Sequence, residues 1–450
     1  MNYAQQNWAK CSPCGYVWKF VGNEGFTPPN TESICLAFSP SGEPYVAYAV
    51  PSPGNFWDTK LSVRKFDGTN WILLGTEGFS ADVAQYISFA FSPAGEPCVA
   101  FMDYSQSLKA TVMEYDGNTW NHIGSAGFSI GPASYLSLSF DSTGQPYVAF
   151  RDGGNFGKAS VMKFDGVSWV YVGNAGISSG DADYTSLTFS PTGEPYLAYQ
   201  DFVNNGRATV KRFDGTNWIE VGEAFVLAGP DYWTKIAFGP SGDPYIAFSD
   251  WSNSAKATVL KYDGIFWQNI GTPGFSEGEV DYLDFAFSPS GEPFVAFSDW
   301  SNSMKATVMK FDGTDWIYLG NAGFSNGYAF YTSIAFSQSG QPYLAFMDAM
   351  QSSKVTVMNY DSVYLGINES NLGKISLYPN PASSVISIAF KDRINKINYL
   401  EITDIRGNLM FVKKNIGNKT SVDIEDYPKG IYFVKLRMEN SHIISKFCKN

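Results

Sequence analysis

The chain has 450 residues, of which 44% are hydrophobic and 16% aromatic, and its formal net charge is −12. This length and apolar content suit one large and one small domain and do not suit a disordered chain. Residues 1–366 hold 18 basic and 35 acidic side chains, whereas residues 367–450 hold 13 and 8. Because phosphate neutralisation needs clustered Lys or Arg, the acidic main part argues against a nucleic-acid partner. No apolar run reaches transmembrane length.

The N-terminal segment, residues 1–15, has no hydrophobic signal core, but its start, Asn2 to Gln6, resembles the mature start of an exported protein. We therefore expect that a signal peptide has been removed from this version. The five cysteines are an odd number, and Cys11 with Cys14 forms a lone C-x-x-C, so neither a disulfide framework nor a zinc site is expected. Cys35 and Cys98 occupy apolar repeat positions and should pack as small hydrophobic side chains.

One unit of about fifty residues recurs seven times. Its turn glycine stands at Gly42, Gly95, Gly144, Gly193, Gly242, Gly291 and Gly340. Six of the units contain four short strands, exemplified by LAFSP, PYVAF, KATVMKF and WIYLG, and the seventh contains only the first three. Asp-Gly pairs between the third and fourth strands, such as Asp312-Gly313, are typical of tight hairpins. A period near fifty with four strands is typical of β-propeller blades.

The tryptophan that marks the fourth strand occurs once before the first full unit, and the last unit lacks it. It occurs at Trp18, Trp71, Trp120, Trp169, Trp218, Trp267 and Trp316. The simplest closure is that residues 16–22 supply the outer strand of the last blade, because a closed ring protects its strand edges. The sequence thus predicts an all-β protein, with a seven-bladed β-propeller over residues 16–361. Without the kelch Gly-Gly doublet, no specific propeller family is assigned.

After a predicted linker, residues 362–373, the composition becomes rich in Lys and Ile, which indicates a second domain over residues 374–450. Three motifs stand there in order: Tyr378-Pro379-Asn380-Pro381-Ala382, Asp404-Ile405-Arg406-Gly407-Asn408 and Lys429 to Lys435, followed by a basic end at Lys446 and Lys449. As a set they resemble the type A C-terminal sorting domain of the type IX secretion system.

This resemblance implies a small Ig-like β-sandwich that is read by the type IX translocon and sorting machinery. It also implies a secreted protein or one on the outer-membrane surface of a Gram-negative bacterium, and removal of the domain after export. The sorting residues it points to are Tyr378, Pro379, Asn380, Pro381, Asp404, Gly407, Gly430, Tyr432 and Lys446. Cys448 departs from the pattern. The alternative is an ordinary Ig-like accessory module.

Within a blade, the loop between the second and third strands and the long connection between blades should share one face of the propeller. Function concentrates on variable loops over a rigid scaffold, so we expect binding there. The second strand ends in Asp in six blades, and the third strand begins with Lys or Arg in all seven. This acid and base form either a structural clasp, which we favour, or part of a repeated ligand site.

Aromatic residues are the second recurring feature of that face. Tyr104, Phe202, Trp251 and Trp300 follow the loop Asp, and Tyr86, Tyr135, Tyr184, Trp233, Tyr282 and Tyr331 open the innermost strands. The second set should surround the channel mouth, or else seal the spaces between blades. Exposed rings beside Asp and Asn suit sugars and protein hot spots. The candidate ligand-binding residues are therefore Asp250, Trp251, Asn253, Asp299, Trp300, Asn302, Tyr104, Phe202, Trp233 and Tyr282.

The long connections contain acidic clusters, Asp181 with Asp183 and Glu277 with Glu279 and Asp281, whose oxygens suit calcium. Solvated charge is the better interpretation of both clusters, and no cofactor is expected. The propeller has one histidine, His122, so a Ser-His-Asp or multi-histidine centre lacks material. We therefore predict a monomeric, non-enzymatic binding protein for a glycan or surface protein. The alternatives are a glycoside hydrolase or lyase with a carboxylate site at the channel mouth, and a structural surface-layer component.

Overall fold

The computed structural model describes residues 14–52, 54–222, 230–364, 375–390, 399–404, 408–414, 419–437 and 442–450. Two compact units are distinguished: Val17–Asp361, and a C-terminal unit that begins at Ser362. Most of the predicted N-terminal segment and of the predicted linker lies outside the described residues. No helix in these described ranges is long and apolar enough to cross a membrane.

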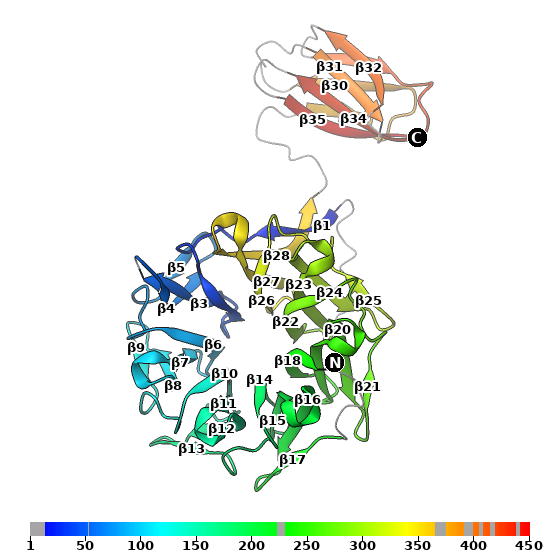
Figure 1. The fold of residues 1–450 in the computed structure, drawn as a ribbon. Coiled ribbons are helices and arrows are strands. Elements are labelled where there is room, and N and C mark those ends of the chain that lie inside the picture. The colour runs from blue at the N-terminus through cyan, green and yellow to red at the C-terminus, as the bar shows by residue number, and fades with distance from the viewer. Residues whose placement is uncertain are drawn as a thin grey trace. The chain divides into compact units, whose positions relative to one another are not determined.

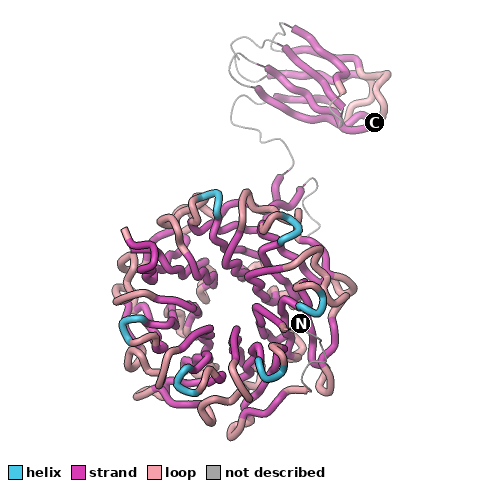
Figure 2. The backbone as a smooth tube through the Cα atoms, viewed as in Figure 1, coloured by secondary structure: helices cyan, strands magenta, loops and turns pink. Residues whose placement is uncertain are grey.

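The large unit consists of seven four-stranded antiparallel sheets arranged in a ring around a central channel (Figures 1 and 2). In six sheets the four strands follow one another in the sequence from the innermost to the outermost. In the last sheet β26, β27 and β28 follow the same order, and the outermost strand, β1, comes from the N-terminus. The strands are β1 (Cys14–Phe20), β2 (Glu32–Phe38), β3 (Pro44–Ser52), β4 (Asn55–Phe66), β5 (Trp71–Leu73), β6 (Ala84–Phe91), β7 (Pro97–Asp103), β8 (Lys109–Tyr115), β9 (Trp120–His122), β10 (Ala133–Phe140), β11 (Pro146–Asp152), β12 (Lys158–Phe164), β13 (Trp169–Tyr171), β14 (Ala182–Phe189), β15 (Pro195–Asp201), β16 (Arg207–Phe213), β17 (Trp218–Glu220), β18 (Asp231–Phe238), β19 (Pro244–Asp250), β20 (Lys256–Tyr262), β21 (Trp267–Asn269), β22 (Val280–Phe287), β23 (Pro293–Asp299), β24 (Lys305–Phe311), β25 (Trp316–Tyr318), β26 (Ala329–Phe336), β27 (Pro342–Asp348) and β28 (Lys354–Tyr364).

The second strand of each blade forms the core of the ring. In β23 every residue from Pro293 to Asp299 is buried, because neighbouring sheets cover both of its faces. Short turns keep these strands in register: Asp312 Oδ1 accepts the N–H groups of Thr314 and Asp315, at 2.9 and 3.0 Å. Gly313 in the same turn has a φ of +104°, a conformation that favours glycine.

The tryptophan of the fourth strand ties each blade to the preceding connection. Trp120 donates its indole N–H to the carbonyl oxygen of Leu74 at 3.1 Å and stacks on Phe79, with ring centroids 4.3 Å apart. Trp18, in β1, makes the same pair of contacts with Leu319 and Phe324, across about three hundred residues of sequence. Strand β1 is hydrogen-bonded to β28, as expected for residues 16–22.

The innermost strands are joined by a second set of contacts. Ser88 Oγ in β6 accepts the N–H of Leu138 in the next blade at 2.9 Å, and Ser137 Oγ accepts that of Leu187 at 2.9 Å. Consecutive inner strands pack side by side around the channel, and β2 also packs against β26. A rigid ring of this kind holds the loops above it in fixed positions.

The C-terminal unit has two sheets, with strand orders β29-β30-β33 and β32-β31-β34-β35. Their strands are β29 (Ile375–Tyr378), β30 (Val385–Phe390), β31 (Tyr399–Asp404), β32 (Leu409–Lys414), β33 (Lys419–Asp423), β34 (Gly430–Arg437) and β35 (His442–Lys449). Buried side chains from both sheets, among them Ile388, Ile402, Val434 and Phe447, form one core. The unit is therefore a small two-sheet β domain.

The predicted sorting motif is attached to the last strand of this domain. Asn380 Oδ1 accepts the N–H of Cys448 at 2.9 Å, and its amide nitrogen donates to the Lys446 carbonyl oxygen at 3.3 Å. The peptide bonds before Pro379 and Pro381 are cis. Lys419 lies over the ring of the half-exposed Tyr378, with its ammonium 5.4 Å from the ring centroid.

The other sorting residues serve turns and core contacts. Asp404 accepts the N–H and the side-chain amide of Asn408, both at 2.8 Å. Tyr432, at the start of β34 after Gly430, is buried, stacks on Phe447 and donates to the carbonyl oxygen of Pro428 at 2.7 Å. Gly407 lies outside the described residues. The structure thus gives most of these residues a role in holding the domain together, and their part in sorting stays a prediction.

Candidate functional site

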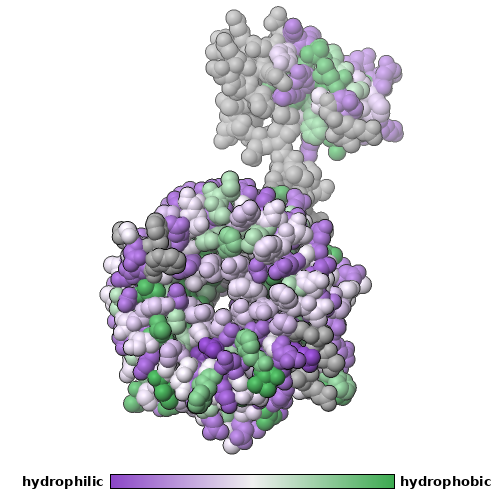
Figure 3. Space-filling view, viewed as in Figure 1, coloured by the Kyte–Doolittle hydropathy of each residue, from purple (hydrophilic) through white to green (hydrophobic). Residues whose placement is uncertain are grey.

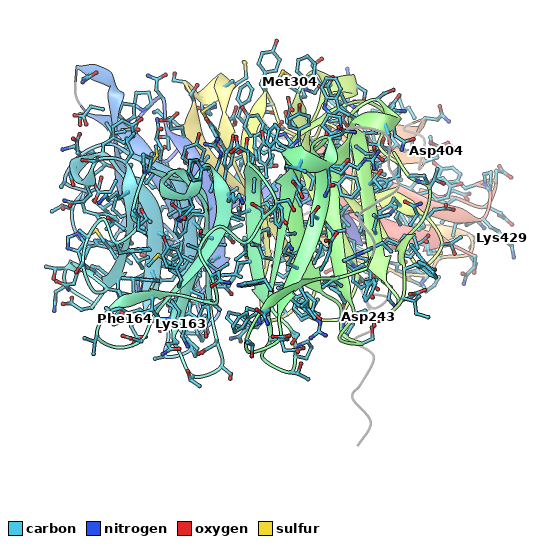
Figure 4. All side chains as sticks on the ribbon, turned by 60° about the horizontal axis from the view of Figure 1, so that its bottom comes forward. Lys163, Phe164, Asp243, Met304, Asp404 and Lys429 are labelled. Carbon is cyan, nitrogen blue, oxygen red and sulfur yellow. The ribbon has the colours of Figure 1, made fainter. Side chains whose placement is uncertain are left out.

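One face of the ring carries both the loops between second and third strands and the long connections between blades. In the sixth blade the backbone N–H of Trp300 donates to the carbonyl oxygen of Glu279, and in the fifth the N–H of Trp251 donates to that of Pro230. Figure 4 shows Met304, in such a loop, on the side of the ring opposite Lys163, Phe164 and Asp243. We call the side with Met304 the loop face.

In six blades the loop between the second and third strands begins with a short 3-10 turn that the Asp of the second strand holds in place. Asp250 is fully buried and accepts from the Ser252 N–H at 3.0 Å, from Asn253 Nδ2 at 2.7 Å and from the Thr258 hydroxyl at 3.0 Å. Asp299 is buried in the same way and accepts from Ser301, Asn302 and Thr307. These candidate ligand residues therefore shape the loop, and their oxygens are already used.

The clasp favoured from the sequence is present in part. The six loop Asp residues cap the 3-10 turns through the backbone N–H two residues on. In the five of these blades whose next strand begins with Lys, the loop Asp forms no ion pair with that Lys among the described residues. The predicted Asp–Lys pairing is wrong in these blades because the carboxylate is buried. Amides and hydroxyls bond both oxygens of Asp250 and of Asp299, whereas Asp348 Oδ2 has no hydrogen-bond partner.

The aromatic residues of these loops are exposed. Trp251 is 53% exposed, Trp300 48%, Phe202 51% and Tyr104 39%. Trp300 donates its indole N–H to Asp281 Oδ2 at 2.8 Å, and Trp251 packs against Tyr232, with ring centroids 5.8 Å apart. Figure 3 shows hydrophobic side chains as separate patches around the ring in this view. The expectation that Trp251 and Trp300 lie in solvent is met.

The aromatic residues that open the inner strands contact one another around the channel. The consecutive ring centroids from Tyr86 through Tyr135, Tyr184, Trp233 and Tyr282 to Tyr331 are 4.7 to 5.1 Å apart. All six residues have a positive φ, between 51° and 57°, at a β-bulge of the inner strand. Such backbone is uncommon outside glycine, and its repetition points to a shared task for these side chains. We call these six residues the aromatic ring.

A cavity of about 460 Å³ lies at the aromatic ring, in the channel. Its volume is within the roughly 300–1,000 Å³ typical of small-molecule sites. Besides the six aromatic residues, Glu32, Ser33, Gln85, Thr234 and Lys235 line it. The expectation that the inner aromatic residues surround the channel mouth is therefore met, and they are half-buried or exposed, as residues of a pocket wall are.

The first blade interrupts the aromatic ring. Ser33 stands where the other blades have Tyr or Trp, and it shares their positive φ. Glu32, the preceding residue, lines the cavity and has no ion pair with any residue in the described ranges. The aromatic ring is thus interrupted at one blade, the first, and Glu32 lies beside this gap.

Three blades also differ two residues further along the inner strand, where four blades carry serine. Lys235 Nζ lies 3.4 Å from Asp284 Oδ1, and the Asp284 charge raises the pKa of Lys235. Cys35 donates its thiol to the Ile87 carbonyl oxygen at 3.3 Å, and burial raises the pKa of its thiol to about 11. Cys98 is fully buried as expected, whereas Cys35 lines the channel cavity and is only partly buried.

An ion cluster stands on the rim between the third and fourth blades. Arg151 lies 3.1 Å from Asp181 and 3.2 Å from Asp183. Burial raises the pKa of Asp183, and the positive charge of Arg151 partly opposes this rise. Burial and the negative charge of Asp183 together raise the pKa of Tyr135. Arg151 thus forms ion pairs with both carboxylates that were considered for calcium. No group of three or more potential metal ligands occurs among the described residues.

Sequence reasoning found the exposed loop aromatics and the aromatic ring but missed the charged residues inside the channel. Glu32, Lys235 and Asp284 each occupy a position held by other residue types in most blades. Aligning the seven inner strands position by position would have shown them. The opening at Ser33 would have appeared in the same comparison.

Among curated proteins, none matches this sequence. Three solved structures are similar at low identity, in fold only. PorZ, a surface component of the type-IX secretion system of Porphyromonas gingivalis, is 14% identical with a TM-score of 0.49 over 92% of this chain and 59% of its own. A PL25 ulvan lyase is 13% identical, with a TM-score of 0.48 over 75% and 94%. The SapL1 lectin is 14% identical, with a TM-score of 0.44 over 66% and 97%.

The present chain spans less than two thirds of the PorZ chain, and all three likenesses are too distant to assign an activity. The C-terminal domain has a definite match. The family model of the secretion system C-terminal sorting domain covers residues 376–450, which contain the Tyr378, Asp404 and Gly430 motifs. The chain is thus a protein sorted by the type IX secretion system for the cell surface or for release, and residues 376–450 are its C-terminal sorting domain.

Proposed function

We propose that the large unit is a seven-bladed propeller, closed by β1, that binds a carbohydrate on its loop face without cleaving it. The observation that carries this proposal is the aromatic ring around a cavity of about 460 Å³, with exposed Trp251 and Trp300 further out. Aromatic faces stack on the apolar faces of sugar rings, and neighbouring polar groups take the hydroxyls.

The polar groups at the mouth suit binding better than hydrolysis. A glycosidase of the usual kind needs two carboxyl groups placed on either side of the scissile bond. Here Asp183 is paired with Arg151, Asp284 with Lys235, and Asp281 accepts the Trp300 indole N–H. His122 is exposed on the outermost strand of its blade, β9, away from the cavity.

A carbohydrate-cleaving enzyme is the second candidate, and one observation favours it. The cluster of Arg151, Asp183 and Tyr135 occurs once in the ring, beside the aromatic residues. A reaction centre is expected to be a single arrangement of this kind. If the protein is an enzyme, this rim is where its chemistry belongs.

The test is a glycan array on the full chain, followed by titration of the bound glycan. The double variant Trp251→Ala, Trp300→Ala removes two exposed rings of the loop face and should weaken binding. Phe266→Ala is the matched control, because Phe266 is 59% exposed in a turn between third and fourth strands, away from the loop face. Release of shorter saccharides would overturn the non-enzyme proposal. Binding to no glycan would favour a protein ligand instead.

A further inference from the structure

We infer that the channel cavity takes one ligand per ring, and that this ligand is the end of a saccharide that carries a free amine. The inference rests on the proposed carbohydrate-binding function and specifies both the site and the chemical class. Three features carry it: an unmet hydrogen-bonding group in the cavity wall, the charge of the cavity, and the opening in the aromatic ring at Ser33.

The unmet group is the hydroxyl of Thr234. It is 2% exposed, lines the cavity and has no hydrogen-bond partner in the structure. The equivalent hydroxyls of Thr185 and Thr332 donate to the carbonyl oxygens of Tyr135 and Tyr282 in the preceding blades. Buried polar groups are nearly always satisfied. The Thr234 oxygen is covered in the structure, so we expect its side chain to turn toward the cavity when a ligand hydroxyl is there to bond.

The charged groups in and around the cavity favour a cation. Lys235 is compensated by Asp284, and Asp183 by Arg151. Glu32 in the cavity wall has no ion pair among the described residues, and Asp281 on the rim accepts only the neutral indole N–H of Trp300. An ammonium group that enters the cavity therefore meets uncompensated negative charge.

The aromatic ring adds to this preference, because a cation over Trp or Tyr faces is attracted by the ring quadrupole. The gap at Ser33 exposes the Glu32 carboxylate at the level of the rings. A lysine side chain would satisfy the charge but would leave the hydroxyl of Thr234 without a partner. A sugar that carries both an amine and hydroxyls satisfies both.

The test uses oligosaccharides of the same length that differ at the amine: glucosamine oligomers with free amines and their fully N-acetylated, uncharged counterparts. Calorimetric titration of the full chain at pH 6 and low salt should give one site per chain and roughly tenfold tighter binding of the free-amine oligomer. Added salt should weaken the binding of the free-amine oligomer and leave the acetylated one unchanged.

Two variants locate the site. Glu32→Gln should remove most of the preference for the free amine. The control variant Glu292→Gln should keep this preference, because Glu292 lies in a turn between first and second strands and pairs with Lys310. Thr234→Val should weaken binding without loss of thermal stability, since it deletes an unsatisfied hydroxyl. Thr185→Val is its control, because the Thr185 hydroxyl is already bonded within the protein.

The outcomes separate the two proposals. Equal or tighter binding of the acetylated oligomer, or an unchanged preference in Glu32→Gln, overturns the amine inference and leaves the carbohydrate function standing. Several equivalent sites per chain overturn the single central site. Tight binding of a lysine-rich peptide with no binding of any saccharide overturns both.

Discussion

Replacing Trp18 by alanine tests whether β1 closes the ring. The indole of Trp18 stacks on Phe324 with centroids 4.2 Å apart and planes 5° apart, and its N–H bonds the Leu319 carbonyl oxygen at 2.8 Å. A fully buried Trp→Ala change costs about 3–5 kcal/mol. Because Trp18 is only partly buried, we expect the lower end, about 3 kcal/mol, from lost stacking, packing and one hydrogen bond.

The assay is denaturant unfolding followed by tryptophan fluorescence. Eleven of the 12 tryptophans, from Trp18 to Trp316, lie in the large unit, and none lies in residues 362–450, so the signal reports mainly the ring. Trp120→Ala is the matched control: it deletes the same stacking, on Phe79 at 4.3 Å, and the same kind of hydrogen bond within contiguous blades. Similar losses in both variants support closure. A loss in Trp120→Ala with none in Trp18→Ala would refute it.

Two further predictions concern a buried carboxyl and the sorting domain. Burial raises the pKa of Asp231 to about 8. The unfolded chain therefore loses this proton at lower pH than the folded protein does. As the pH rises from about 4 to 8, the Asp231 carboxyl increasingly destabilises the folded state. Asp231→Asn should match the wild type in thermal melting near pH 4 and exceed it near pH 8; a constant difference across this range would contradict the assigned cause. Asn380→Ala removes the hydrogen bonds to Cys448 and Lys446, so less protein should reach the cell surface or medium in a fractionation experiment. The control variant Ser387→Ala, at a surface hydrogen bond to Ser421, should be exported normally. Equal export of both variants would show that the hydrogen bonds of Asn380 are dispensable.

The sequence was sufficient to predict the architecture because every blade repeats the same local signals. Glycines such as Gly313 mark turns that need positive φ, and the spacing of tryptophans predicted that Trp18 joins the last blade. The sorting domain was identified from three motifs, and its family match confirms that identification. Each of these features depends on a short stretch of chain and can therefore be recognised in a single sequence.

The functional surface was predictable only in part. Exposure of Trp251 and the gathering of Tyr86 and its equivalents followed from blade topology. Burial of Asp250 did not, because it depends on whether the loop amides and the Thr258 hydroxyl reach the carboxylate. The pairing of Lys235 with Asp284 joins two adjacent blades, and repeat spacing carries no information about which exceptional residues meet.

The most direct test of the account is a titration of the glycan selected on the array with the variant Trp233→Leu. Trp233 lies in the aromatic ring, where its centroid is 4.7 Å from that of Tyr282, and it lines the cavity. The loss of one aromatic stacking contact, about 1–3 kcal/mol, should weaken binding by about fivefold to 150-fold in a variant that melts like the wild type. Unchanged affinity in that variant would contradict a carbohydrate site at the channel mouth.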